Sequence, residues 1–185
     1  MRVLFLGKRD DPRSEQALAK CRARFAAVDA HLGEFGEPLP PPARAWEGDL
    51  IISYLSRWIV PAALLDRARY AVNFHPAPPE YPGVGCVNFA LYDGAASYGV
   101  TCRHMAAVVD SGDIIAVRRF PVRPDDDVES LLRRSYECQF SLFGEIIELL
   151  ATGRPLPSAT ERWGAHTYTK ARVECVCQGP AGYVR

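Results

Sequence analysis

The chain of 185 residues is long enough for one domain with a hydrophobic core, or for one domain with a short appendage. Hydrophobic residues make up 48% and charged residues 24%, and 22 basic side chains balance 22 acidic ones, so the composition lacks the basic excess that a nucleic-acid partner usually requires. The apolar start at residues 2–7 is too short for a signal peptide, and no apolar run approaches the roughly 18 residues of a membrane span. We therefore expect a cytoplasmic protein that binds neither membrane nor nucleic acid.

The first predicted elements are a strand and a helix. Residues 2–7 form a continuous apolar run that is typical of a buried strand, and residues 12–27 carry apolar side chains at helical spacing. Residues 36–42 are rich in proline. Because proline lacks a backbone N–H and clashes with the preceding helical turn, we predict that this segment is a loop and joins neither a helix nor an inner strand.

A strand, a helix and another strand are predicted next, at residues 49–54, about 60–68 and 70–75. Pro61 falls in the first turn of this helix, where proline is accommodated because the first N–H groups of a helix have no partner within it. The strand at 70–75 leads into a proline-rich loop at 76–85.

A short helix at 87–92, strands at 98–108 and 114–122 and a long helix complete the predicted elements. Helices alternate with strands in the first half of the chain, which is the pattern of a parallel sheet. We therefore predict an α/β fold: a Rossmann-like, mostly parallel sheet flanked by helices, with a short C-terminal extension of a helix plus a tail. Residues 166–175 could add one strand in this tail.

The long helix is the element with the clearest start and stop signals. Asp126 can cap it, Glu129 stands three residues later as a capping box requires, and Gly153 and Pro155 end it. Its apolar positions follow a helical period, at Val128, Leu131, Leu132, Tyr136, Phe140, Phe143, Ile146, Ile147 and Leu150.

The six cysteines lack the paired CxxC spacing of a zinc site. In a chain without a secretion signal they are best interpreted as free thiols, several of them buried. Cys175 and Cys177 form a lone CxC without a second pair of ligands, so we expect no metal. The other cysteines are Cys21, Cys86, Cys102 and Cys138.

Asn73 and His75 stand two residues apart at the end of a predicted strand. Residues at this spacing point to the same face, and the carboxyl ends of parallel strands form the ligand crevice of an α/β sheet. An amide and an imidazole in one crevice supply a hydrogen-bond donor and a proton acceptor. The spacing is equally compatible with Asn73 capping a turn and His75 being a half-buried histidine with satisfied hydrogen bonds.

The surrounding sequence resembles the formyltransferase family. Residues 73–83 (NFHPAPPEYPG) resemble its Asn-x-His strand and the following Pro/Gly loop, and residues 98–101 (YGVT) with 109–115 (VDSGDII) resemble its second signature. The family includes glycinamide ribonucleotide, methionyl-tRNA and nucleotide-sugar formyltransferases, and formyltetrahydrofolate hydrolases. The resemblance implies that residues 1–153 form a catalytic domain and that the tail at 154–185 packs on or near its active site.

The resemblance also implies three catalytic roles. Asn73 is expected to donate a hydrogen bond to the formyl oxygen as it becomes an oxyanion, and His75 to shuttle the proton or polarise that oxygen. Asp110 is expected to orient His75 or a water and to raise the pKa of the histidine by stabilising its charged form. Without the resemblance, Asp110 in Asp-Ser-Gly is ordinary turn chemistry.

The formyl donor of this family is N10-formyltetrahydrofolate, and its pterin is expected beside two loops, where backbone groups do most of the recognition. Trp58 in the first loop could equally be a packing residue at the start of a helix. The residues expected at the donor site are Tyr54, Leu55, Ser56, Arg57, Trp58, Ala106, Ala107, Val108 and Val109.

One departure from the family concerns the position two residues after Gly-Val-Thr. Some relatives carry a histidine there, whereas this chain has Arg103, with His104 one position later. His104 is therefore interpreted as an ordinary strand residue rather than a catalytic one.

The acceptor is expected to be a small amine. A tRNA acceptor is disfavoured by the zero net charge and by the short stretch after the long helix, and Lys8, Arg9 and Arg13 are more typical of a solvated charge run than of a phosphate site. Residues 166–170 (HTYTK) resemble a segment of sugar N-formyltransferases, which favours a nucleotide-linked amino sugar. The residues expected at the acceptor are Pro78, Tyr81, Gly83, Tyr168 and Lys170.

The sequence is compatible with two other functions. A formyltetrahydrofolate hydrolase would use water as the acceptor and keep the same three residues. A non-catalytic folate- or nucleotide-binding module would need none of them. The sequence is also compatible with a homodimer.

Overall fold

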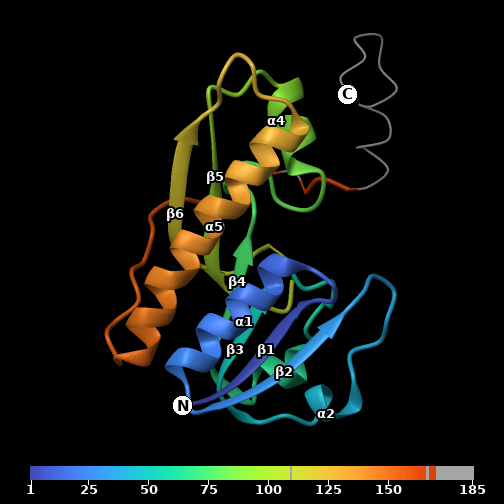
Figure 1. Cartoon of the computed structure of the whole chain (residues 1–185), viewed down its shortest axis with the longest axis vertical. Coiled ribbons are helices and arrows are strands. Elements are labelled where there is room, and N and C mark those ends of the chain that lie inside the picture. The colour runs from blue at the N-terminus through green and yellow to red at the C-terminus, as the bar shows by residue number, and fades with distance from the viewer. Residues whose placement is uncertain (109, 166, 170–185) are drawn as a thin grey trace.

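The computed structural model describes residues 1–108, 110–165 and 167–169. Its centre is a six-stranded sheet in the order β2-β1-β3-β4-β5-β6 (Figure 1). The strands are β1 (Arg2–Lys8), β2 (Ala27–Gly33), β3 (Gly48–Tyr54), β4 (Ala68–His75), β5 (Ser97–His104) and β6 (Ile114–Pro121). The helices are α1 (Pro12–Arg24), α2 (Pro41–Arg44), α3 (Ala62–Leu65), α4 (Cys86–Tyr92) and α5 (Val128–Ala151).

The sheet divides into a parallel and an antiparallel part. The strands β2, β1, β3 and β4 pair in parallel, whereas β5 pairs antiparallel with both β4 and β6. This arrangement confirms the predicted α/β fold with a mostly parallel sheet flanked by helices. It also places the carboxyl ends of β1, β3 and β4 at the same edge, where a ligand crevice is expected.

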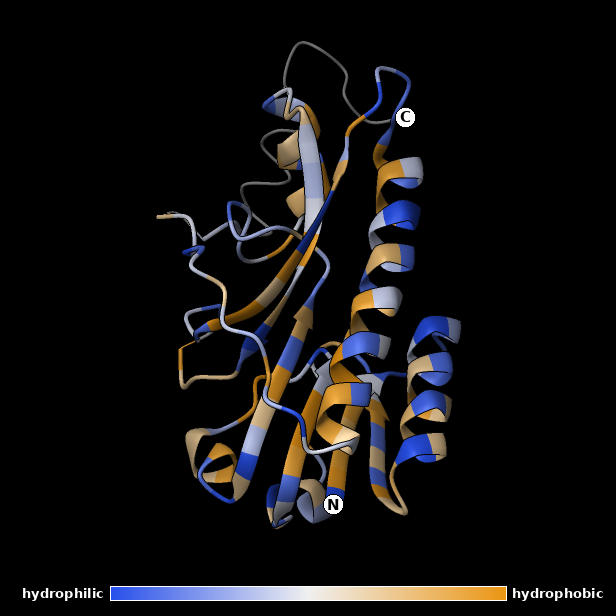
Figure 2. Ribbon diagram, turned by 90° about the vertical axis from the view of Figure 1, so that its left-hand side faces the viewer, coloured by the Kyte–Doolittle hydropathy of each residue, from blue (hydrophilic) through white to orange (hydrophobic). Residues whose placement is uncertain are grey.

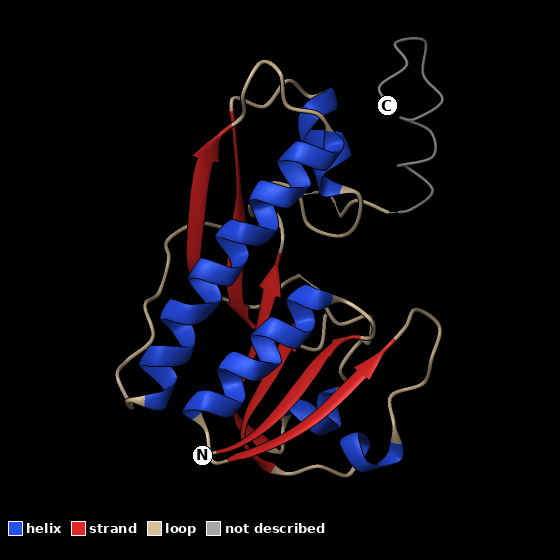
Figure 3. Ribbon diagram, viewed as in Figure 1, coloured by secondary structure: helices blue, strands red, loops and turns tan. Residues whose placement is uncertain are grey.

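Each face of the sheet carries its own helices. The long helices α1 and α5 lie side by side against one face (Figures 1 and 3), and hydrophilic stretches follow their outer surfaces (Figure 2). The short helices α2 and α3 pack on the opposite face against Leu4, Leu6 and Ile51. Because side chains alternate along each strand, Phe74 points to the α1/α5 face while its neighbours Asn73 and His75 point to the other.

Several predicted boundaries were wrong. The helix predicted at 12–27 ends at Arg24, because the chain turns extended at Phe25 and enters β2, an edge strand that was missed. The predicted loop at 36–42 contributes Pro41 and Pro42 to α2, since proline fits the first turn of a helix.

The remaining boundary errors lie around β4 and β5. The helix predicted at 60–68 is limited to Ala62–Leu65 because β4 already starts at Ala68. The strand predicted at 98–108 ends at His104, where the chain turns toward β6.

The cap of α5 was predicted one residue too early. Asp127 accepts a hydrogen bond from the backbone N–H of Ser130 at 2.7 Å, and the Ser130 hydroxyl accepts one from the backbone N–H of Asp127 at 3.0 Å. The capping box is therefore Asp127 and Ser130 rather than Asp126 and Glu129. Asp126 instead accepts from the backbone N–H of Arg123 and from the Arg134 guanidinium.

The chain after α5 runs back beside the sheet. The backbone N–H of Ala159 donates to the carbonyl of Ile114 at 2.9 Å, and that of Gly164 donates to the carbonyl of Pro79 at 2.8 Å. Tyr168 pairs with Gly83 in an isolated bridge. These contacts attach the described part of the tail to β6 and to the loop after β4. The predicted strand at 166–175 lies mostly outside the described residues.

Candidate active site

A cleft of about 560 Å³ opens at the carboxyl ends of β3 and β4 and extends to the first half of α5, where Val128, Leu132 and Tyr136 line it. Three of its lining residues are the predicted catalytic set: Asn73, His75 and Asp110. Five of the predicted donor-site residues also line it, namely Leu55, Ser56, Arg57, Trp58 and Ala106, as does the predicted acceptor residue Gly83.

Strand register brings the polar residues of the cleft together. Asn73 in β4 lies opposite Ser53 in β3 on one side and opposite Arg103 in β5 on the other. Residues that face each other across a ladder project to the same side of the sheet. A shift of register between Cys102 and Arg103 marks a bulge at this point of β5, a feature that redirects side chains next to active sites.

Asn73 is partly buried, and its side-chain amide is held by the neighbouring strand. Its Nδ2 donates to the Ser53 hydroxyl at 3.0 Å. Nδ2 also lies 3.5 Å from the Ser53 carbonyl oxygen, at the limit of a hydrogen bond, so a ligand in the cleft would compete only with this weak second contact.

His75 is 7% exposed, and its ring orientation is fixed by a backbone carbonyl. Its Nε2 lies 2.9 Å from the carbonyl oxygen of Tyr81. A carbonyl oxygen can only accept, so Nε2 carries the proton and the lone pair of the neutral ring is on Nδ1. Burial lowers the pKa of His75, an effect opposed by the negative charge of Asp110 and by the Tyr81 hydrogen bond, and the positive charge of Arg103 lowers it further. The ring is therefore neutral at pH 7.

Asp110 does not bond to His75 in the way that was expected. One of its carboxylate oxygens accepts from Arg103 Nη2 at 2.7 Å, and the other accepts from the backbone N–H of Gly83 at 2.8 Å. Its negative charge does act to raise the pKa of His75, as expected, but burial outweighs this contribution and the net pKa of His75 is lowered. Asp110 has a φ of 51° and Leu55 a φ of 53°. Such left-handed conformations are costly for these residues and cluster at functional sites.

Buried polar side chains hold the backbone that follows His75. The carbonyl of Pro76 accepts from the Ser135 hydroxyl at 2.7 Å and from the Tyr98 hydroxyl at 3.2 Å. The carbonyl of Ala77 accepts from the Thr101 hydroxyl at 2.8 Å. A catalytic side chain needs such support because small misplacements of a reacting group reduce the rate strongly.

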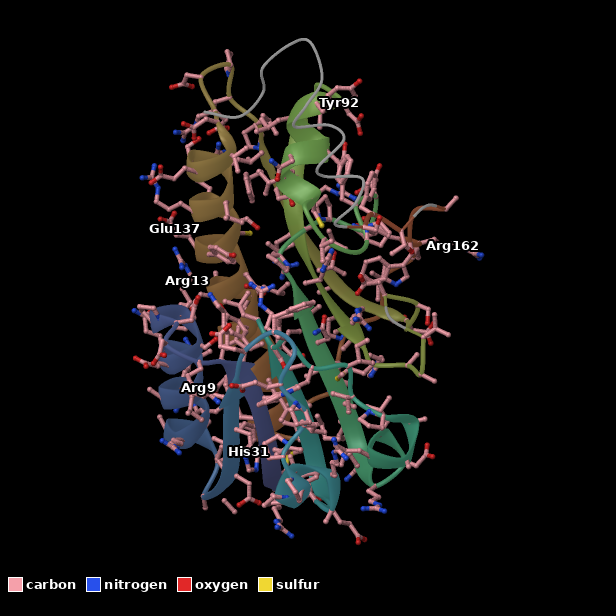
Figure 4. All side chains as sticks on the ribbon, turned by 90° about the vertical axis from the view of Figure 1, so that its right-hand side faces the viewer. Arg9, Arg13, His31, Tyr92, Glu137 and Arg162 are labelled. Carbon is pink, nitrogen blue, oxygen red and sulfur yellow. The ribbon has the colours of Figure 1, made fainter. Side chains whose placement is uncertain are left out.

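Trp163, from the tail, completes the wall behind His75. Its ring meets the imidazole of His75 edge to face at 5.9 Å between centroids, and the Arg103 guanidinium lies 5.7 Å from its centre. Its Nε1 donates to the carbonyl of Gly112 at 2.9 Å. The adjacent Arg162 projects outward from the ribbon (Figure 4).

Several predicted donor-site residues do not line the cleft. The Tyr54 side chain is fully buried on the α1/α5 face, where it packs against Phe74 and Phe143. Ala107 and Val108 are exposed outside the cleft, and Val109 lies outside the described residues. Trp58 is compatible with both a donor-site role and a packing role, because it lines the cleft while its Nε1 donates to the Glu37 carbonyl at 3.0 Å.

The predicted acceptor residues are distributed around the loop after β4. Pro78, Tyr81 and Tyr168 do not line the cleft, and Lys170 lies outside the described residues. Tyr81 instead supports His75 through its carbonyl and bonds Asp93 through its hydroxyl at 3.3 Å.

Sequence reasoning missed three contributors: Ser53, Arg103 and Trp163. Arg103 was noticed only as a departure from relatives, and its pairing with Asp110 depends on the bulge in β5. Ser53 could have been found from the strand alternation that places it on the same face as Asn73. Trp163 stands in an irregular segment that carries no periodic signal.

Within the described residues, the structure contains no group of three His, Cys, Asp or Glu side chains that could hold a metal ion. Nor does this part of the chain contain a helix with the length and hydrophobicity needed to cross a bilayer. Cys21, Cys86 and Cys102 are free and buried, as their interpretation as apolar thiols implied, whereas Cys175 and Cys177 lie outside the described residues.

Comparison with known proteins gives three findings. A family model described as formyl transferase matches residues 33–147. The methionyl-tRNA formyltransferase of Trichlorobacter lovleyi is 33% identical over 120 residues, which are 64% of this chain and 38% of that protein. This chain therefore spans less than half of that relative.

Two solved structures share the fold. The sugar N-formyltransferase of Shewanella sp. superposes with a TM-score of 0.76 at 16% identity, covering all of this chain and 83% of that one. The N-formyltransferase of Helicobacter canadensis, in complex with folinic acid and dTDP-3-aminofucose, gives a TM-score of 0.77 at 15% identity and covers 92% of this chain and 71% of that one.

Proposed function

Because this chain belongs to the formyl transferase family, as its motifs predicted, we propose that it moves a formyl group from N10-formyltetrahydrofolate to the primary amine of a small acceptor. The observation that carries the proposal is the cleft in which Asn73, His75 and Asp110 meet. No other described cavity combines an amide donor, a neutral imidazole and a carboxylate.

The arrangement suits formyl transfer step by step. Asn73 uses an N–H of its side-chain amide to stabilise the negative charge that develops on the formyl oxygen, an effect worth about 3 kcal/mol in comparable sites. His75 accepts the proton of the attacking amine on Nδ1 and returns it to the departing folate nitrogen. Asp110 keeps a negative charge beside His75 that stabilises the imidazolium formed in between. The formyl carbon thus gains a bond to the acceptor nitrogen and loses its bond to the folate.

The cleft also fits the donor in size and character. Its volume of about 560 Å³ lies in the range of sites for small molecules and cofactors. Leu55, Trp58 and Val60 give it an apolar wall suited to a flat heteroaromatic ring, and Ser56 and the backbone beside Ala106 supply polar groups. Folinic acid bound by the Helicobacter canadensis relative supports a folate here.

A nucleotide-linked amino sugar is our proposed acceptor. It is supported by the fold shared with two N-formyltransferases, one of which was crystallised with dTDP-3-aminofucose. Gly83 lines the cleft beside the catalytic residues and is paired with Tyr168. We propose that this paired segment, together with Pro78, Tyr81 and Lys170, borders the acceptor.

The donor assignment can be tested by calorimetric titration with a stable N10-formyl folate analogue. We expect binding at micromolar concentrations that formyl phosphate does not displace. Ala106→Trp places a large ring in the cleft and should weaken binding by at least about tenfold, whereas Ala107→Trp, one residue outside the cleft, should not.

Absence of folate binding by the folded protein would refute the proposed function. Equal weakening by both tryptophan variants would show that the folate binds elsewhere. Rapid turnover without any amine would assign a formyltetrahydrofolate hydrolase instead.

A further inference from the structure

One buried charged group of the cleft, the Arg103 guanidinium, has no role in the proposed reaction. The Arg103 and Asp110 side chains are 6% and 5% exposed, and they form an ion pair at 2.7 Å. Removing two charges from water is costly, so a buried pair is weak evidence for stability and calls for another explanation. Its place between Asn73 and the Asp110 turn indicates a role in the site.

The ion pair replaces the contact that Asp110 lacks with His75. Both Asp110 oxygens are occupied, by Arg103 and by the backbone N–H of Gly83, while the His75 ring is held by the Tyr81 carbonyl. The carboxylate is therefore fixed from two sides, and neither of these hydrogen bonds involves the imidazole. It acts on His75 through its charge, and Arg103 is the side chain that, with the Gly83 N–H, fixes where that charge lies.

The other side of the guanidinium is closed by the tail. Arg103 Nε is buried and has no hydrogen-bond partner among the described residues, and the Trp163 ring covers the group. Trp163 is tied to Gly112, two residues after Asp110, so the ring and the carboxylate are fixed to the same turn. Because the ring keeps water away from the ion pair, solvent screens the two charges less.

We propose that Arg103 is a positioning residue of this active site: it holds the Asp110 carboxylate as a fixed charge beside His75, and Trp163 shields the ion pair from water. The inference rests on the proposed function, because it assigns Arg103 a part in keeping His75 ready to accept a proton. Arg103 itself touches no reacting atom.

The groups that face His75 come from five segments. Arg103 comes from β5 and Asp110 from the turn that follows it, and Cys86 of α4 lies with its sulfur 3.8 Å from Nε2. The loop after β4 and the tail add the Tyr81 carbonyl and the Trp163 ring, which carry no charge. Arg103 and Asp110 act on the imidazole in opposite directions, so removing Arg103 leaves the carboxylate unopposed.

The test is a nuclear magnetic resonance titration of the His75 ring in the ligand-free protein. Arg103→Met should raise the pKa of His75 by about one pH unit or more, as expected for a nearby unpaired charge. Arg118→Met is the matched control: it removes an arginine that is paired with Glu145 on the opposite face of the sheet, and should leave His75 unchanged. An unchanged His75 titration in folded Arg103→Met overturns the inference.

A second pair of variants covers the case in which Arg103→Met does not fold. Trp163→Leu should let water reach the ion pair and the imidazole beside it, and the reduced burial should move the pKa of His75 up, while Arg162→Leu, whose side chain points outward, should not (Figure 4). Identical titrations in these two variants also overturn the inference.

The activity of the Arg103 variant separates positioning from structural damage. With a higher His75 pKa, the turnover number at pH 7 should fall and should recover as the pH rises, whereas a misfolded site would stay inactive at every pH. The titration needs neither folate nor amine. A wild-type protein that fails to transfer formyl groups would thus refute the proposed function without deciding the role of Arg103.

Discussion

His75→Ala is expected to lower the turnover number for formyl transfer by at least about a hundredfold, because it removes the imidazole whose Nδ1 is proposed to take the amine proton. Asn73→Ala should cost a similar factor, since it deletes an oxyanion donor that acts in the transition state rather than in the bound ground state. Steady-state kinetics with a saturating acceptor would measure both. Folate affinity should change much less, because backbone groups are expected to supply most of that binding.

His104→Ala is the control for these variants. His104 ends β5, one residue after the bulge at Cys102 and Arg103, and it does not line the cleft. Its replacement should keep the turnover number within a few-fold of wild type. Loss of turnover in folded His104→Ala, together with normal turnover in His75→Ala, would show that the catalytic histidine has been misplaced. The turnover number of the Asn73/His75 double variant should be little lower than that of the less active single variant, because the effects of groups that act together are not additive.

Asp110→Ala is expected to reduce the free energy of unfolding by about 3–5 kcal/mol, because it leaves the Arg103 guanidinium buried without a counter-ion. The turnover number should also fall by at least about a hundredfold, since the charge that stabilises the imidazolium is lost. Replacing both partners, as in Arg103→Met with Asp110→Leu, should restore most of the stability because no unpaired charge remains. It should restore none of the activity. Urea denaturation followed by circular dichroism would give the free energies.

Asp113→Ala provides the matched control in the same turn. Asp113 is exposed and its side chain forms no ion pair within the described part of the chain, so its loss should change the free energy of unfolding by less than about 0.5 kcal/mol. If Asp110→Ala is as stable as Asp113→Ala, the ion pair is not buried as described. If the double replacement is active, Asp110 does not contribute its charge to the reaction.

Much of the fold followed from the sequence because strong periodic signals decide element type. The apolar run in β1 and the helical period of α5 each agree with the structure. The strand β2 was not predicted because its sequence, AVDAHLG, mixes polar and small residues and lacks a β-branched run. An edge strand, which is paired on one side only, tolerates such a sequence. The predicted cap of α5 differs from the observed one because three consecutive aspartates are equivalent candidates in the sequence, and Asp126 binds Arg134 instead of capping the helix.

The site was partly predictable for a different reason. Asn73 and His75 follow from strand alternation and the position of the strand end, both of which are local. The partners of Asp110 are not local: they depend on a bulge in β5, on a glycine N–H in the loop after β4, and on the Trp163 ring from the tail. Sequence patterns describe the periodicity within an element, whereas these contacts depend on how separate elements meet.

The most direct test of the central claim is mass spectrometry of acceptor amines after incubation with the protein and N10-formyltetrahydrofolate. The panel should include nucleotide-linked amino sugars and simple primary amines. We predict that wild-type protein adds one formyl group to at least one acceptor, with an equal amount of tetrahydrofolate released, and that His75→Ala forms none above background. A folded wild-type protein that binds the folate analogue but formylates no amine in the panel, or a His75→Ala variant that formylates as fast as wild type, would contradict the account.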